Sequence, residues 1–312
     1  MKNINIGQKE IIHFIGIGGI GMSGLAQVMK TMGFKIQGSD LSKNKSTSNC
    51  LKAGIKVFIG HAKKNIKNAT MIVKSSAIKE NNPEIKLAKK KRIPIYNRAE
   101  ILANVVALKK NIIITGSHGK TTTTSLVSKI LYDQKLDPTI INGGVINSFR
   151  SNAKLGKGDW AILEADESDG SFLKLPINYS IVTNIDYEHL DYYRTYKNLE
   201  NAFIRFINKT PPIGKSLVCS DNKNLNKILT KIKNINLKLI GEHNVLNASA
   251  AVAVCINLGV KIDIIKKALK NFSGVQRRMT KIFTKNKNEF FDDYAHHPTE
   301  IASILEGVKK VY

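Results

Sequence analysis

The sequence predicts an α/β protein with a Rossmann-like parallel-sheet domain, a central P-loop α/β domain and the start of a third α/β domain. Strand-like and helix-like segments alternate from residue 11 onward, which is typical of parallel sheets covered by helices. A G-x-G-x-x-G motif follows the first strand at residues 16–21, and a G-x-x-G-K-T motif follows a later strand at residues 116–121. Glycine-rich loops between a strand and a helix bind phosphate groups, so both domains are predicted to bind nucleotides.

The first domain begins with a complete dinucleotide-binding fingerprint. A strand at Ile11–Ile15 leads into the glycine motif, a helix follows from Met22, and a second strand at Phe34–Gly38 ends at Ser39 and Asp40. This order predicts a diphosphate at the helix N-terminus and a ribose hydroxyl at Asp40. A nucleotide-sugar meets these demands as well as NAD does, so the fingerprint by itself leaves both open.

The same alternation continues through the first hundred residues, which predicts a doubly wound parallel sheet. Ser75 and Ser76 follow directly on a predicted strand at Met71–Lys74. Ligands bind outside the carboxyl ends of the strands in such sheets, which makes both serines candidates for a binding site. Capping of the next helix is the alternative role for them.

The loop at residues 116–122 is predicted to hold phosphates. An apolar strand at Ile112–Thr115 precedes it, and a helix with apolar residues at helical spacing follows. Lys120 is placed to reach the β- and γ-phosphates, and the Thr121 hydroxyl to ligate magnesium. The motif is shorter than the usual G-x-x-x-x-G-K-[ST], and an ordinary βα turn with an exposed lysine is the alternative.

Acidic and histidine side chains follow two further strands of this domain. Glu164 comes directly after a predicted strand at Trp160–Leu163, and His189 follows one at Ser180–Ile185 among acidic neighbours. A carboxylate at the end of a core strand beside a phosphate loop is where Walker-type proteins hold magnesium. Glu164 is therefore favoured over a plain acidic surface loop. His189 is predicted to bind a metal ion or phosphate, with a structural histidine as the alternative.

Two further polar segments are predicted to form a turn and the start of a helix. The segment Asn142–Val145 (NGGV) is predicted to form a glycine-rich turn, and Asn244 and Asn247 precede an apolar helix predicted at Ala248–Leu258. Buried amides read the edges of nucleobases, but asparagines also cap helices. Both roles stay open for these two residues.

Composition limits the function classes. A length of 312 residues suggests two to three domains. The net charge of +25 is spread over all segments, and no aromatic residues interleave with the basic runs, so no specific nucleic-acid partner is expected.

No apolar run is long enough to span a bilayer, and the N-terminus lacks the apolar core of a signal peptide. Three cysteines lie far apart in the chain, which fits a reducing compartment. We expect a cytoplasmic protein without membrane insertion.

Seven motifs together resemble those of the Mur ligase family. In chain order they are HFIGIGGIGMSGLA, GSHGKTTTT, EADESDGSF, TNIDYEHLD, GEHNVLNA, VQRR and DDYAHHPTE. The resemblance covers essentially the whole chain, and the short glycine spacing of the phosphate loop is the family's own form. The family usually has threonine where Ser117 stands, and serine keeps the hydroxyl.

The resemblance implies an ATP-dependent ligase that joins L-alanine to the lactyl carboxylate of UDP-N-acetylmuramate in peptidoglycan precursor synthesis. The γ-phosphoryl group of ATP would convert the carboxylate into an acyl phosphate, which the amine attacks. The implied cofactors are ATP and Mg²⁺. The implied catalytic residues are Lys120, Glu164 and His189, and the implied metal ligands are Thr121, Glu164 and His189. The implied ATP-binding residues are Gly116, Ser117, His118, Gly119, Lys120, Thr121, Thr122, His243, Asn244, Asn247 and Arg278. The implied UDP-sugar-binding residues are Gly18, Gly19, Ile20, Gly21, Met22, Ser39, Asp40, Ser75, Ser76 and His297.

The resemblance also sets the expected domains. We expect a UDP-sugar-binding domain over residues 1–108, an ATP-binding domain over 109–274, and the incomplete start of a C-terminal ligase domain over 275–312. Family members carry a complete third domain, so the chain is expected to be a truncated gene product, a fragment or half of a split enzyme. A split enzyme would have a separate C-terminal domain polypeptide as its partner. Poor turnover or none is expected from the chain alone. A sister ligase that attaches a peptide to the same sugar nucleotide is one alternative. A nucleotide-binding module without catalysis is a second alternative, and a nucleic-acid binder is a third.

Overall fold

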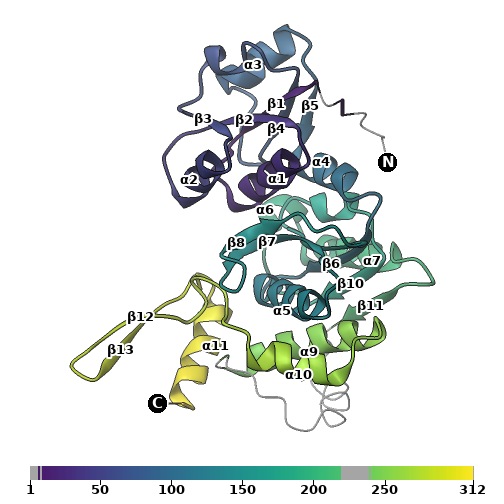
Figure 1. Ribbon diagram of the computed structural model, residues 1–312, viewed down its shortest axis with the longest axis vertical. Coiled ribbons are helices and arrows are strands. Elements are labelled where there is room, and N and C mark those ends of the chain that lie inside the picture. Colours follow the sequence, from purple (N-terminus) through teal and green to yellow (C-terminus); the bar gives the residue numbers. More distant parts are fainter. Residues whose placement is uncertain (1–5, 8, 219–238, 240, 312) are drawn as a thin grey trace. The chain divides into compact units, whose positions relative to one another are not determined.

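The computed structural model describes residues 6–7, 9–218, 239 and 241–311, which form two compact units (Figure 1). The first unit runs to Lys109 and includes the short segments Ala153–Leu155 and Lys174–Pro176, and the second holds the remaining described residues. The apolar run at 217–220 predicts a strand, and its last two residues, Cys219 and Ser220, lie outside the described residues.

The first unit contains a five-stranded sheet with the order β3-β2-β1-β4-β5, in which every neighbouring pair is parallel. Its strands are β1 (Ile11–Ile15), β2 (Lys35–Asp40), β3 (Lys56–Ile59), β4 (Met71–Lys74) and β5 (Ile95–Asn97). Its helices are α1 (Ile20–Thr31), α2 (Lys45–Lys52), α3 (Pro83–Lys90) and α4 (Arg98–Val105), with a 3₁₀ turn at Lys63–Ile66. This is the doubly wound sheet that the sequence predicts.

The strand order of the first unit positions its glycine loop. The chain runs from β1 outward to β2 and β3, then returns to the other side of β1 for β4 and β5. Ligands bind at such a switch point, outside the carboxyl ends of the strands. The glycine loop after β1 and the serine pair after β4 both lie at this edge. Apolar side chains that include Ile15, Ile72 and Ile85 are buried together in this unit.

The second unit contains a six-stranded sheet with the order β11-β10-β6-β9-β7-β8, parallel from β11 to β7. Its strands are β6 (Lys110–Thr115), β7 (Thr139–Ile146), β8 (Ser151–Lys154), β9 (Trp160–Glu164), β10 (Tyr179–Val182) and β11 (Lys215–Val218). Its helices include α5 (Lys120–Asp133), α6 (Leu190–Tyr193), α7 (Tyr196–Asn208), α9 (Glu242–Asn257) and α10 (Ile262–Lys270), with a 3₁₀ turn at Ser171–Lys174.

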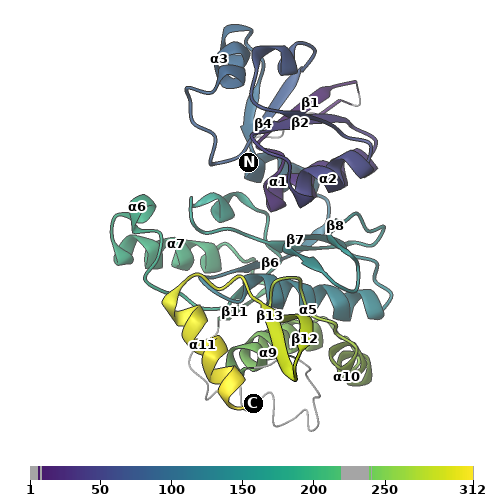
Figure 2. The ribbon, with the colours of Figure 1, turned by 90° about the vertical axis from the view of Figure 1, so that its left-hand side faces the viewer.

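Helix α5, which begins at the phosphate loop, is enclosed between the sheet and the helix pair α9 and α10 (Figure 2). Leu126, Val127, Ile130 and Leu131 of α5 are fully buried and belong to the main core of this unit. This burial stabilises a helix whose first turns contain a run of threonines, which have low helix propensity. The core therefore holds the phosphate loop between a buried strand and a buried helix.

Two local expectations are corrected by the structure. Asn142–Val145 lies inside strand β7 and is not a turn. The strand pairs with β9 over Thr139–Ile141 and continues through the glycines to Ile146, and Gly143 allows close approach to Glu164. The helix expected from Ala248 begins six residues earlier, at Glu242. Asn244 and Asn247 are therefore buried residues of its first turns.

The last described segment groups with the second unit. It forms an antiparallel hairpin of β12 (Thr280–Lys285) and β13 (Asn288–Asp292), followed by α11 (Pro298–Lys309). An isolated bridge joins Ile146 to Val275 at its start. No helix in the described part of the chain is long and apolar enough to cross a bilayer.

Candidate active site

The glycine loop of the first unit is fixed by the acidic residue at the end of β2. The Gly18 N–H donates to Oδ2 of Asp40 over 2.7 Å, and the Asn44 side chain donates to the Gly18 carbonyl over 3.2 Å. Gly19, Ile20, Gly21 and Met22 form the turn and the first turn of α1. Asp40, expected at a ribose, thus orients the loop that precedes the helix N-terminus.

Ser39 turns its side chain into the interior of the first unit. It is fully buried, and its hydroxyl donates to Oε2 of Glu84 over 2.6 Å. Asn65 donates to the other oxygen of Glu84 over 2.7 Å, and the imidazole nitrogens of His13 and His61 each lie 3.4 Å from Oε2. No sequence pattern indicated this buried network, because its members come from separate segments.

The serine pair lies at the binding edge of the same sheet. Ser75 follows β4, and a Cβ built at Gly16 of the glycine loop would lie 3.1 Å from the Ser75 Cβ. The alternative role as a helix cap is wrong, because the next helix begins at Pro83 and is capped by the Asn82 side chain. Ser75 and Ser76 therefore remain predicted ligand contacts.

The phosphate loop of the second unit has the predicted strand–loop–helix form. It connects β6 to α5, and Gly119 is the N-cap of α5 in a left-handed conformation with φ of 81°. A Cβ at this position would also overlap the Asn247 side chain, so glycine is required for two reasons. The free N–H groups at the start of α5 make this end of the helix a site for anions.

Lys120 is the first residue of α5, and its ammonium group is held against the loop. Its Nζ donates to the carbonyls of Gly116 and Ser117 and forms an ion pair of 2.9 Å with Oε1 of Glu167. Burial alone would lower the pKa of Lys120, but the charge and hydrogen bond of Glu167 outweigh it and raise the pKa. The lysine is therefore a preformed positive charge at the phosphate loop.

Glu164 and Thr121 meet beside this lysine. The Thr121 hydroxyl donates to Oε1 of Glu164 over 3.0 Å, and the Gly143 N–H donates to Oε2 over 2.6 Å. Burial raises the pKa of Glu164, against the opposing effect of the Lys120 charge. Strand β7 runs close to the carboxylate, because a Cβ at Gly143 would lie 2.7 Å from the Glu164 Cδ.

A second group of possible metal ligands adjoins Lys120. Glu167, Glu188 and His189 each offer one ligand atom within 4.8 Å of the others. The hydrogen bond from His189 to Glu167 raises the pKa of the imidazole, and Oε2 of the buried Glu167 has no hydrogen-bond partner among the described residues. His189 was predicted from the sequence; Glu167 was not, although the EADESD motif contained it.

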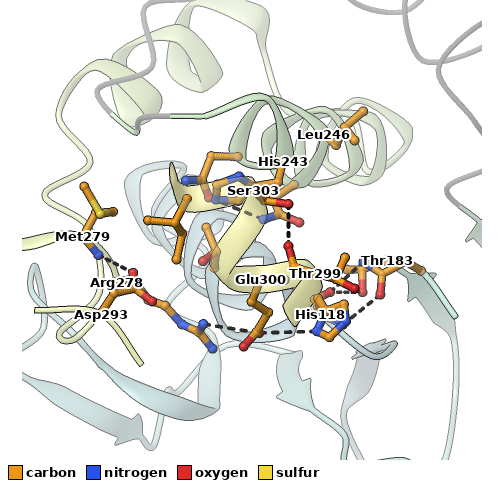
Figure 3. Close-up of a pocket in the computed structure, with 16 residues that line it drawn as sticks. His118, Thr183, His243, Leu246, Arg278, Met279, Asp293, Thr299, Glu300 and Ser303 are labelled. Carbon is orange, nitrogen blue, oxygen red and sulfur yellow. Dashed lines mark hydrogen bonds and ion pairs between the residues drawn. The ribbon is translucent and has the colours of Figure 1, made fainter. Parts of the chain in front are cut away.

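The residues expected around adenine come together in a pocket of about 230 Å³ (Figure 3). Asn244 and Asn247 of α9 line it together with His243, and Arg278 and the phosphate-loop residues His118, Gly119 and Thr122 contribute from other segments. Burial lowers the pKa of His243. Sequence reasoning missed the further lining residues Thr183, Asn184, Asp293, Thr299, Glu300 and Ser303.

His297 lies in the second unit, beside the phosphate loop. Its ring centroid is 5.0 Å from that of His118, although the family resemblance implied different ligands for the two residues. Glu300 of α11 also faces His118 (Figure 3), and the Thr299 hydroxyl donates to Asp186, the neighbour of His118. Residues 118 and 297 are brought together only because α11 groups with the central sheet.

The second unit has groups that suit a hard divalent cation. Mg²⁺ prefers oxygen ligands, and the site offers the Thr121 hydroxyl and the buried Glu164 carboxylate. It also offers Oε2 of Glu167, which has no hydrogen-bond partner within the described part of the chain. Lys120 supplies the complementary charge for a polyphosphate. The arrangement can therefore neutralise a triphosphate through the Lys120 charge, a bound cation and the N-terminus of α5.

Comparisons with known proteins identify the family of this chain. Residues 11–110 match the family described as "Mur ligase family, catalytic domain", and residues 114–238 match "Mur ligase middle domain". The UDP-N-acetylmuramate–L-alanine ligase of Pelagibacter ubique is 52% identical, with 99% of this chain and 76% of the relative aligned. The enzyme of the same name from Brucella anthropi is 42% identical, with 98% and 74% aligned. The chain thus spans about three quarters of the length of these relatives.

Solved structures of ligases also resemble this chain. The UDP-N-acetylmuramate–alanine ligase of Thermotoga maritima superposes with a TM-score of 0.86 at 30% identity, covering 96% of this chain and 78% of that one. A murein peptide ligase from Psychrobacter arcticus superposes with a TM-score of 0.80 at 24% identity, over 96% of this chain and 76% of that one, and this likeness shows the fold alone. From the two family matches and the high identity over nearly its whole length, the chain belongs to the Mur ligase family.

Proposed function

We propose that this chain carries out the ATP-dependent joining of L-alanine to UDP-N-acetylmuramate. The observation that best supports the ATP-dependent step is the preformed charge arrangement at the phosphate loop, where Lys120 pairs with Glu167 and Thr121 with Glu164. The substrate assignment is supported by the names of the relatives at 52% and 42% identity.

The chemistry explains why these groups are needed. A carboxylate is a poor electrophile, so transfer of the γ-phosphoryl group of ATP to the lactyl carboxylate makes an acyl phosphate and ADP. The alanine amine then attacks the acyl carbon, and phosphate leaves as the amide forms. Phosphoryl transfer depends on positioning and on neutralisation of charge. Lys120 and the N-terminus of α5 provide this at the phosphates.

Magnesium would be held by Thr121 and Glu164, with His189 and Glu167 as further ligands, and when bound it would neutralise phosphate charge. The pocket lined by Asn244, Asn247 and Arg278 would take the adenosine part. Buried amides can exchange paired hydrogen bonds with a nucleobase edge, and the left-handed Gly119 keeps the loop clear of Asn247.

The first unit would bind the uridine diphosphate-sugar. Its glycine loop lies at the switch point of a parallel sheet, and the N-terminus of α1 would face the diphosphate. Ser75 and Ser76 lie at the same edge. This assignment explains a dinucleotide fingerprint in a chain whose second unit already has a phosphate loop of its own.

Product analysis tests the proposal. The chain is incubated with UDP-N-acetylmuramate, Mg-ATP and an equimolar mixture of L-alanine and an L-alanine-containing tripeptide, and the products are separated and weighed by mass spectrometry. We expect a product heavier than UDP-N-acetylmuramate by one alanyl residue, and no such product when ATP is omitted. Exclusive addition of the tripeptide would establish the sister activity instead. Alanine addition without ATP would overturn the proposed mechanism.

A further inference from the structure

Four side chains from three segments of the second unit surround one point beside the phosphate loop. His118 belongs to the loop, Asp186 and Glu188 follow β10, and His297 precedes α11. Nε2 of His118 lies 3.1 Å from Oδ2 of Asp186 and 3.4 Å from Oε1 of Glu188. His297 places Nδ1 3.9 Å from Asp186 Oδ2 and Nε2 3.6 Å from Glu188 Oε1. We propose that this histidine–carboxylate cluster binds a divalent transition-metal ion of the Zn²⁺ type.

The spacing of the ligand atoms suits such an ion. Ligands held at about 2.0–2.1 Å from a tetrahedral zinc ion are about 3.3 Å from one another. With Nε2 of both histidines as ligands, the nitrogen–oxygen separations are 3.1 and 3.4 Å from His118 and 3.6 Å from His297 to Glu188. One ligand atom each from His118, Asp186 and His297 also lie within 4.8 Å of one another. Small side-chain movements are enough to bring them onto one ion.

The chemistry of the ligands distinguishes this cluster from the proposed magnesium site. Two imidazoles with carboxylates suit zinc, cobalt or nickel, whereas magnesium prefers a shell of oxygen atoms and water. The magnesium site proposed at Thr121 and Glu164 consists of hydroxyl and carboxylate groups. The cluster therefore goes beyond the proposed ligase activity, and its existence does not depend on that activity.

The surroundings of His118 give independent support. Its Nδ1 lies 3.4 Å from Oε1 of Glu300, and Glu300 is only 11% exposed. Metal-binding histidines characteristically donate their second ring N–H to a carboxylate, which fixes the ring and its tautomer. Glu300 therefore leaves Nε2 of His118, the nitrogen that faces Asp186 and Glu188, available for a metal ion.

The carboxylate and the second histidine are also oriented by neighbours. The Thr299 hydroxyl donates to Oδ2 of Asp186 over 2.9 Å, as is usual for carboxylates that bind metals. The Thr299 N–H approaches Nδ1 of His297 at 3.4 Å. Coordination through Nε2 would place the proton of His297 on Nδ1 and give up this contact. A bound ion would join the phosphate loop to the start of α11.

Cobalt substitution tests the site without any activity measurement. The metal-free chain is titrated with Co²⁺, and visible absorption is recorded, since tetrahedral Co²⁺ with nitrogen ligands absorbs far more strongly than the hydrated ion. We expect one equivalent of Co²⁺ to produce the band, and Zn²⁺ to abolish it by displacement. The band should persist in a large excess of Mg²⁺. Displacement of Co²⁺ by Mg²⁺ would mean that the ion occupies an oxygen site, and would overturn the proposal.

Matched variants locate the ion. His297→Gln and Asp186→Asn should each weaken Co²⁺ binding at least tenfold, whereas His296→Gln, at the adjacent and 73% exposed histidine, should keep it. His189→Gln should also keep the band, because His189 belongs to the neighbouring group of ligands. Circular dichroism confirms that each variant is folded. Loss of the band in the His189 variant, unchanged binding in the His297 variant, or no band in the wild type would each refute the site.

Discussion

Replacement of Lys120 by methionine should destabilise the protein as well as remove a phosphate contact. The Lys120 side chain is 18% exposed and its partner Glu167 is 1% exposed, at 2.9 Å. Removing one member of a buried ion pair costs about 3–5 kcal/mol when the remaining charge is left without compensation. We expect the lower part of this range for Lys120→Met, because Glu167 keeps its contact with His189. That loss is large beside a typical net stability of about 5–15 kcal/mol.

A double-mutant cycle isolates this effect. Urea unfolding is measured for the wild type, Lys120→Met, Glu167→Gln and the double variant, with near-ultraviolet circular dichroism as the probe. We expect the double variant to be more stable than Lys120→Met, because a neutral amide at position 167 no longer needs the lysine, with a coupling energy of about 1–3 kcal/mol. Lys174→Met is the control, since its pair with Glu100 is exposed and surface pairs contribute about 0–1 kcal/mol.

The same variants separate stability from binding. Lys120→Met and the double variant should both lose measurable ATP binding by calorimetry, although the double variant recovers stability. If Lys120→Met is as stable as the wild type and the two single effects simply add, the two side chains are not coupled. If the double variant binds ATP like the wild type, Lys120 is not a phosphate ligand.

Three further predictions concern other residues. Gly143→Ala should weaken Mg-ATP binding at least tenfold in calorimetry, because the new Cβ displaces the Glu164 carboxylate; unchanged affinity would contradict this. Asn247→Ala should lower ATP affinity by roughly tenfold, equivalent to about 1.4 kcal/mol, and should leave UDP-sugar binding unchanged. Glu84→Gln should lower the melting temperature at neutral pH. Burial alone would raise the pKa of Glu84, but hydrogen bonds, chiefly from His13, outweigh it and lower the pKa. The stability that the ionised carboxylate contributes is therefore present above the unfolded pKa of about 4.3 and is lost as the pH falls through the pKa of the folded state. The difference between the wild type and this variant should therefore shrink in acid, and a constant difference would contradict the reasoning.

The sequence correctly predicted the features that are formed by residues close together in the chain. The strand, glycine loop and helix around Lys120 are contiguous, so their periodicity and loop residues are enough to place them. Glu164 was predicted correctly at the end of a strand beside that loop, because a buried apolar run ends there. The identification of Ser75 and Ser76 at the binding edge followed from the rule for parallel sheets.

The sequence could not show which distant residues meet. EADESDGSF offers several acids, and only the pairing of β9 with β6 places Glu167 on Lys120. NGGV has the composition of a turn, but it lies inside β7 and Gly143 donates its N–H to the Glu164 carboxylate, so the tertiary context overrides the local preference. His118 and His297 meet because α11 lies against the phosphate loop, which no local pattern encodes.

The proposal assigns the UDP-sugar to the first unit and ATP to the second, and its most direct test is sequential calorimetry on the 312-residue chain. UDP-N-acetylmuramate is titrated first, then Mg-ATP into the same sample, and NADH into a fresh one. We expect one equivalent of each of the first two ligands to bind without displacing the other, because each unit has its own glycine loop, and no heat from NADH. Competition between the UDP-sugar and ATP for a single site, or stoichiometric binding of NADH, would contradict the assignment of the two loops.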